Sequence, residues 1–278
     1  MPLIQQIDSL SEILGAALVA FLPFELWRRY KRGTLNWATI REMGASISPV
    51  FPTILLGGVI TACVIWLFGM AASIAPWRLP VNAWTALAAL ILLDFIYYWD
   101  HRCGHRVRLY WAISHSVHHS SNQFDQTTGL RISAIDGFLS PWFYTPIIIL
   151  GFDPFLVAAC FSLNLAYQQW IHTETIGKLG WFDAVFNSPS NHRVHHGSQP
   201  KYLDKNYGAI LMIWDKLFGT YQAEEETVIY GLTVPLNTAN PIIVHFAEAA
   251  SLARDMTDAK SWVNRFELAF RPPGFQTK

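Results

Sequence analysis

Long uncharged stretches, separated by polar blocks, dominate this chain. They cover Met43 to Trp77, Leu79 to Leu93 with its extension Phe95 to Trp99, Gly137 to Phe152, and Pro154 to Ile171. The core of the first, Val50 to Ser73, is long enough to cross a bilayer as a helix. The last two are divided by Asp153-Pro154, and we expect them to enter and leave the membrane as a hairpin. The pattern predicts an all-α, multi-pass integral membrane protein.

A shorter apolar run lies near the start of the chain. Ile13 to Phe24 is bounded by Glu12 and Glu25, and it would cross a membrane only if Leu10 and Trp27 contribute. The segment from Met1 to Leu10 lacks Lys and Arg, and we expect no removable signal peptide there.

Two polar blocks interrupt the apolar runs, at residues 101–133 and 172–235. Residues 236–278 look like a tail that is helical from Pro241 to about Phe270 and is then broken by Arg271-Pro272-Pro273-Gly274. No repeat separates one part of the chain from another. We therefore expect one membrane-integrated domain over residues 1–278, with the residues that carry chemistry within 94–235.

The distribution of charge predicts an orientation. The basic residues between the first and second runs are Arg28, Arg29, Lys31, Arg32 and Arg41, and those after the third run are Arg102, Arg106 and Arg108. The connection between residues 74 and 82 has only Arg78. By the positive-inside rule, the first connection and both polar blocks are expected on the cytoplasmic face.

Composition agrees with a membrane protein and excludes some functions. Hydrophobic residues make up 52% of the chain and charged residues 14%, where a soluble domain has about 25% charged residues. The formal net charge is zero, so no overall field favours nucleic acid as a partner. The three cysteines are scattered and are expected to be reduced thiols.

Nine of the ten histidines fall in four tight groups, each beside an apolar run. They are His101 and His105; His115, His118 and His119; His172; and His192, His195 and His196. Spacings of three and four residues share one helix face, so each group is expected to aim its imidazoles at one point. This is more imidazole than one tetrahedral site uses, which predicts two metal ions. The repeated HxxHH pattern makes coincidence a poor explanation.

The residue types narrow the metal without choosing it. With no group of thiolates, iron–sulfur clusters and cysteine-type zinc sites are excluded, whereas iron, copper and zinc all accept imidazole. His172 follows an apolar run directly, so the alternative for it is an interfacial histidine in an aromatic belt. His245 stands alone on an apolar face, and we interpret it as a packing residue.

Two carboxylates are candidates for supporting roles. Asp94 lies seven residues before His101, on the same helix face, and an acid at membrane depth needs a partner. It could accept a hydrogen bond from a ligand histidine, or reach water or Arg102 at the interface. Glu174 could be a ligand, an acceptor for a ligand histidine or a charge at a helix start. We favour the acceptor role.

The histidine boxes resemble those of the fatty acid hydroxylase/sterol desaturase superfamily. The text around them is most similar to its alkylglycerol monooxygenase-like branch, in the segments 167–174, 187–197, 204–208, 213–220 and 228–232. The resemblance implies that the nine histidines bind two iron ions. It further implies O₂ as co-substrate, a membrane lipid as substrate, and an external reductant, either tetrahydrobiopterin or an electron-transfer protein.

The implied reaction is hydroxylation of a lipid C–H bond, of ether-lipid, fatty acyl or sterol type. One departure is Ile176, which stands where some members have a further histidine, so that a ligand is absent or is supplied by Glu174. The boxes do not separate hydroxylation from desaturation or methyl oxidation, because all begin with hydrogen abstraction. A metal carrier or silent metal-binding scaffold is less favoured, because a transporter would place polar ligands near the bilayer midplane.

Overall fold

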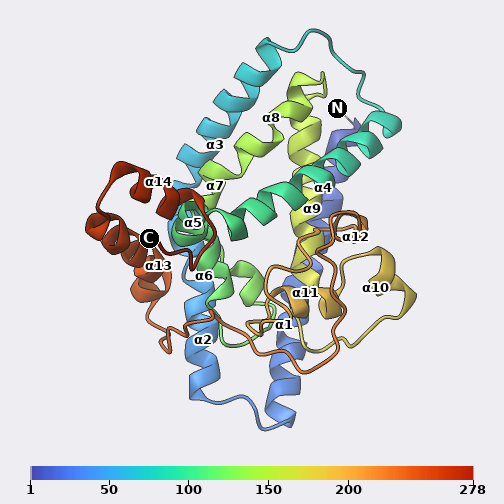
Figure 1. Cartoon of the computed structure of the whole chain (residues 1–278). Coiled ribbons are helices and arrows are strands. Elements are labelled where there is room, and N and C mark those ends of the chain that lie inside the picture. Colours follow the sequence, from blue (N-terminus) through green and yellow to red (C-terminus); the bar gives the residue numbers. More distant parts are fainter. Residues whose placement is uncertain (1, 278) are drawn as a thin grey trace.

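Helices make up the regular structure of this chain. The computed structural model describes residues 2–277, and within them only isolated β-bridges accompany the helices (Figure 1). In order the helices are α1 (Pro2–Lys31), α2 (Trp37–Ile47), α3 (Val50–Ser73), α4 (Ala83–Arg106), α5 (Arg108–Tyr110), η1 (Trp111–His115), α6 (Ser116–His119), η2 (Thr128–Leu130), α7 (Asp136–Leu139), α8 (Pro141–Ile149), α9 (Pro154–Trp170), α10 (Trp181–Val185), α11 (Pro189–His195), α12 (Ile213–Leu217), α13 (Pro241–Asp258) and α14 (Trp262–Phe270). The predicted all-α class is confirmed.

Three helical segments are long and apolar enough to cross a membrane. They are α1, the nearly continuous pair α2–α3 from Trp37 to Ser73, and α4. The short run from Ile13 to Phe24 lies inside α1, a helix of 30 residues, which supplies the length that the run lacks. Asn82 starts α4 with a capping box in which its side chain accepts from the backbone N–H of Trp84 and Thr85. The helix then carries the chain from the apolar core to His101 and His105 without a break.

The predicted hairpin consists of α8 and α9, of nine and 17 residues. Its turn contacts the connection between α3 and α4, because the N–H of Leu79 donates to the carbonyl of Gly151 at 2.8 Å. Gly151 has a φ of +96°, and a Cβ there would lie 2.5 Å from Trp77 Cδ1, so the turn requires glycine. The hairpin therefore turns at the same end of the molecule as the α3–α4 connection.

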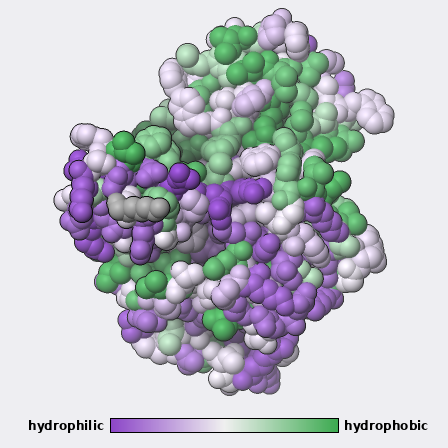
Figure 2. Space-filling model, in the orientation of Figure 1, coloured by the Kyte–Doolittle hydropathy of each residue, from purple (hydrophilic) through white to green (hydrophobic). Residues whose placement is uncertain are grey.

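Helices α1, α3, α4, α8 and α9 pack around one apolar core. Fully buried residues such as Leu93, Ile147 and Leu156 lie at its centre. Large apolar side chains also face outward from α3, among them Ile54 and Trp66. Figure 2 shows apolar surface over the part of the molecule that holds α3, α4 and α8, and mostly hydrophilic surface elsewhere. An apolar exterior above a hydrophilic end is what a membrane-embedded half requires.

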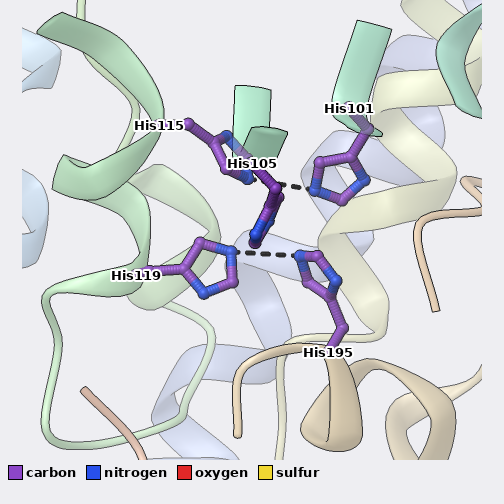
Figure 3. A group of neighbouring side chains, drawn as sticks. All are labelled: His101, His105, His115, His119 and His195. Carbon is purple, nitrogen blue, oxygen red and sulfur yellow. Dashed lines mark hydrogen bonds between the residues drawn. The ribbon is translucent and has the colours of Figure 1, made fainter. Parts of the chain in front are cut away.

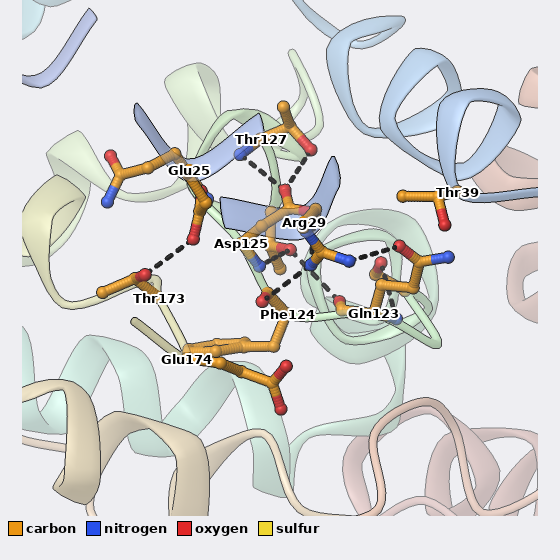
Figure 4. Close-up of polar contacts among 12 residues, drawn as sticks. Glu25, Arg29, Thr39, Gln123, Phe124, Asp125, Thr127, Thr173 and Glu174 are labelled. Carbon is orange, nitrogen blue, oxygen red and sulfur yellow. Dashed lines mark hydrogen bonds and ion pairs between the residues drawn. The ribbon is translucent and has the colours of Figure 1, made fainter. Parts of the chain in front are cut away.

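The last turns of α1 contact both polar blocks (Figure 4). Arg29 forms an ion pair with Asp125 at 3.0 Å. Glu25 accepts hydrogen bonds from the backbone N–H of Gln126 at 2.9 Å and from the hydroxyl of Thr173 at 2.6 Å. The basic first connection and both polar blocks therefore lie at one end of the molecule.

This contact carries a prediction about topology. In a background without native cysteines, Leu35→Cys and Pro200→Cys are expected to react with a membrane-impermeant maleimide from the same side. Arg78→Cys, in the α3–α4 connection, is expected to react from the opposite side and is the control. Labelling of positions 35 and 200 from different sides of sealed vesicles would contradict this arrangement.

Candidate metal centre

The nine histidines of the four sequence groups come together as two sets. One contains His101, His105, His115, His119 and His195, and the other contains His118, His172, His192 and His196. Within each set the nitrogen atoms that could bind an ion lie within 4.8 Å of one another. Figure 3 shows the first set, in which rings from α4, η1, α6 and α11 are turned toward a common centre. All nine are buried except His115, which is half-buried.

Each HxxHH box is divided between the two sets, which corrects the expectation that a box aims all its rings at one point. His192 and His196 join one set and His195 the other. On a helix, residues four apart differ in direction by about 40°, whereas neighbours differ by about 100°. The outer histidines of a box therefore share a direction, and the middle one points to the adjoining centre.

The spacing of the ring nitrogens suits metal coordination. Nε2 of His101 lies 3.0 Å from Nε2 of His115, and Nε2 of His119 lies 3.0 Å from Nε2 of His195. In the second set, Nε2 of His172 lies 2.9 Å from Nε2 of His192. Two imidazole nitrogens bound at about 2.1 Å from an ion and at a right angle lie about 3.0 Å apart. The observed separations match such a pair.

Backbone carbonyls orient three of the rings. Nδ1–H of His101 donates to the carbonyl of Tyr207 at 2.8 Å, and that of His195 donates to the carbonyl of Lys205 at 2.9 Å. His172 donates in the same way to Gln168 at 2.9 Å. Because a carbonyl only accepts, these bonds fix the proton on Nδ1 and leave the Nε2 lone pair free for an ion.

Burial keeps these rings neutral, as metal ligands must be. Removal from water lowers the pKa of His172 to about 4 and that of His195 to about 3. Within the two sets, Nε2 of His105 and Nε2 of His196 are buried and have no hydrogen-bond partner among the described residues. Unpaired buried nitrogens are costly unless a ligand completes them, so the donor set fits metal ions.

A close approach of α4 to η1 brings the first box to the centre. A Cβ on Gly104 would lie 3.3 Å from Cγ of His115. Glycine thus lets the ring of His115 pack against α4, between His101 and His105. The segment that carries His115 is a π-helical turn, which the spacing of the box does not reveal.

Asp94 holds a loop and contacts no imidazole in the described residues. Its carboxylate accepts from the backbone N–H of Ile210 at 2.8 Å and of Leu211 at 3.2 Å, and from Nε1 of Trp214 at 2.8 Å. This loop also contains Tyr207, whose carbonyl orients His101. Asp94 therefore accepts no hydrogen bond from a ligand histidine, although one had been expected. It instead holds the loop whose Tyr207 carbonyl orients His101.

A second buried carboxylate, Asp215, holds the same loop and was not found from the sequence. Asp215 is fully buried and accepts from the N–H of Tyr207 at 2.8 Å and of Gly208 at 2.7 Å. Its hydrogen bonds fix the stretch of chain whose carbonyls orient His101 and His195. The only local signal was an acidic residue directly after the apolar run Ala209 to Trp214, and this pattern is too common to single out Asp215.

We predict that Asp94→Asn lowers metal affinity and turnover by about 10-fold, because one acceptor oxygen is replaced by a donor and the loop loosens. Metal content after dialysis and turnover per loaded centre would measure this. Asp153→Asn, which alters only the cap of α9, keeps a side-chain oxygen that can accept the same hydrogen bonds, and it is expected to change stability by at most about 0.5 kcal/mol and to lose no metal. Wild-type behaviour of Asp94→Asn would reduce Asp94 to a structural carboxylate.

Glu174 and His245 lie apart from the two sets. Glu174 is exposed and accepts a hydrogen bond from the hydroxyl of Tyr230 at 3.1 Å, so the structure gives it no place beside a ligand histidine. His245 is half-buried in α13, where Nδ1 bonds the carbonyl of Pro241 in the same helix. The position of Ile176 is therefore not compensated by Glu174.

A cavity of about 580 Å³ opens from the histidines into the apolar half of the molecule. His101, His115, His118, His172 and His192 line one part of it, from both sets. The side chains that line much of the rest are apolar: Ile60, Val64, Phe68, Val157 and Phe161. A long hydrocarbon chain fits such walls.

Comparison with known proteins decides the family. A model of fatty acid hydroxylases matches residues 86–220, the region that contains both polar blocks up to Thr220. These residues place the chain in the fatty acid hydroxylase family. No solved structure gives a significant match.

This member of the fatty acid hydroxylase family is similar to several lipid-modifying enzymes. Human alkylglycerol monooxygenase is 43% identical over 200 residues, which are 72% of this chain and 44% of the relative. The Xenopus tropicalis enzyme of the same name is 37% identical over 85% of this chain and 52% of its own. Ornithine lipid hydroxylase OlsE of Rhizobium tropici is 29% identical over 50% of this chain and 42% of its own. The chain thus spans about half the length of these curated relatives.

Proposed function

We propose that this protein is an O₂-dependent, non-haem di-iron oxygenase that hydroxylates a C–H bond of a membrane lipid. The observation that carries the proposal is the cavity that joins both histidine sets to an apolar interior. A lipid can extend its chain into this cavity without leaving the membrane. The reacting carbon then lies at the histidine end.

The protein's own contribution is positioning and exclusion of water. The nine histidines hold two iron ions, and carbonyls of Gln168, Lys205 and Tyr207 fix the orientation of three rings. Bound iron would supply the activation of O₂. The apolar walls keep bulk water away from the reacting end of the cavity. They also hold the hydrocarbon chain of the lipid in line with that end.

The names of the relatives support an ether lipid as the first substrate to test. Alkylglycerol monooxygenases are among the proteins to which this chain is similar, and so is a lipid hydroxylase. The external reductant is tetrahydrobiopterin or an electron-transfer protein, and we place the centre on the cytoplasmic face because the basic first connection lies beside it. A second candidate is desaturation, supported by 26% identity to a Delta(7)-sterol 5(6)-desaturase of Aspergillus fumigatus over 46% of this chain.

The test is metal analysis followed by product analysis. Purified protein is expected to contain two iron ions per chain. Incubated with a long-chain alkylglycerol, O₂ and reduced pterin, it is expected to add one oxygen atom to the lipid, whereas the loss of two hydrogens from a lipid substrate would show desaturation. Zinc-loaded protein is the control, because zinc has no redox chemistry. A well-folded sample that holds one iron or none, or leaves every lipid unchanged, would overturn the proposal.

A further inference from the structure

One wall of the apolar cavity carries a cluster of polar side chains. Asp100 accepts from the hydroxyl of Tyr110 at 2.7 Å and from that of Tyr144 at 3.3 Å, and Ser140 also donates to it. Asp136 accepts from Ser114 at 2.9 Å, and the hydroxyl of Tyr110 lies 3.2 Å from the same oxygen. We call Asp100, Tyr110 and Asp136 the acid–tyrosine cluster. It joins α4, α5 and α7 within one cavity wall.

The cluster has one open acceptor. Both oxygens of Asp100 receive hydrogen bonds, and so does Oδ1 of Asp136. Oδ2 of Asp136 receives no hydrogen bond from the described residues, and the protein does not fully enclose it. Asp136 itself is half-buried and lines the cavity. This oxygen is therefore accessible to a molecule in the cavity.

The cluster lies at the histidine end of the cavity. Asp100 directly precedes His101, and Ser114 directly precedes His115, and all four line the cavity. The apolar wall formed by α3 and α9 lies beyond. A ligand that bonds the open oxygen therefore has its polar end beside the centre and its chain in the apolar part.

The chemistry of the cluster selects a hydrogen-bond donor. The open oxygen of Asp136 can accept a hydrogen bond, so it favours hydroxyl groups over esters or hydrocarbon, and no Lys or Arg pairs with either acid among the described residues. Buried carboxylates without a cation are costly and need donors. A phosphate group would meet two nearby acids and be repelled.

We propose that Asp136, held by Tyr110 and Asp100, accepts a hydrogen bond from a free hydroxyl on the substrate's polar end. It thereby positions the carbon beside that end at the metal centre and selects neutral hydroxylated lipids over phosphorylated or fully blocked ones. The inference rests on the proposed function, because it assumes that the cavity holds the substrate. It assigns these residues a positioning role.

The test measures binding apart from turnover. Zinc-loaded protein in detergent is titrated with a hexadecyl glycerol ether that has both hydroxyls free, and with its dimethylated analogue, against a fluorescent alkyl lipid. Wild type is expected to bind the free form about 10–100-fold more tightly, the range of a hydrogen bond to a charged group. Asp136→Asn is expected to reduce this ratio, and Asp136→Leu to bring it close to one.

Thr53→Val is the matched control. Thr53 lines the same cavity, but its hydroxyl bonds the carbonyl of Pro49 in its own chain segment, so the ratio is expected to stay at the wild-type value. A wild-type ratio near one, or an unchanged ratio in both Asp136 variants, would overturn the inference. If Asp136→Leu does not fold, Asp136→Asn decides. A clear binding preference with no oxidation of any lipid would keep the inference and remove the proposed function.

Discussion

His195→Ala is expected to abolish turnover and to strip metal from the protein. His195 contributes to one histidine set, lies 3.0 Å from His119 between ring nitrogens and is oriented by the carbonyl of Lys205. Its loss removes a metal–nitrogen bond from one centre and disturbs the box that supplies the other. The effect should exceed the about 10–100-fold loss typical of residues that only orient a ligand. Metal content and lipid turnover measure it together.

His245→Ala is the matched control for that substitution. His245 is half-buried and bonds only the carbonyl of Pro241 among the described residues, so its loss should cost about 1 kcal/mol of stability. Metal content and turnover are expected to stay near wild type. If His245→Ala is as inactive as His195→Ala, the ligand assignment is wrong and the centre includes the C-terminal segment.

Arg131→Met is expected to lower the free energy of unfolding by about 3–5 kcal/mol, because it leaves Glu42 buried without its cation. Arg131 is fully buried and pairs with Glu42 at 2.7 Å. It also donates to the carbonyl of Val117 at 3.1 Å, within the first HxxHH box. Chemical unfolding in detergent measures the loss, and a lower metal content is expected with it.

The double variant Arg131→Met, Glu42→Met separates the causes. Removing both charges leaves no unpaired ion, so much of the lost stability is expected to return. Stability that stays as low in the double variant as in the single one would show that the contacts of Arg131 with the box, not the ion pair, matter most.

The sequence predicted the spanning helices well, because uncharged length is a strong local signal. Val50 to Ser73 is α3 residue for residue. The run from Ile13 to Phe24 was harder, because the polar residues that lengthen α1 are stabilised by contacts far away in sequence, such as the pair of Arg29 with Asp125. Such contacts have no signature in local hydropathy.

For the site, residue type and spacing identified the nine histidines that come together. Their division into two sets was not predicted, because it depends on how α4, α6 and α11 meet. The orienting carbonyls of Lys205 and Tyr207 were beyond reach for another reason: every residue has a carbonyl, so the sequence cannot mark those that matter. Asp100 and Asp136 were missed because their contacts are long-range.

The division of each HxxHH box between two sets has a consequence for how the protein fills with metal. In the proposed di-iron centre, one short helical segment would present neighbouring rings to both ions, so ordering that segment around the first ion would also arrange ligands for the second. The two sites would then fill as a unit, and limiting iron would give a mixture of empty and fully loaded molecules. The same sharing forbids insertions inside a box, since one added residue would exchange which ring serves which ion.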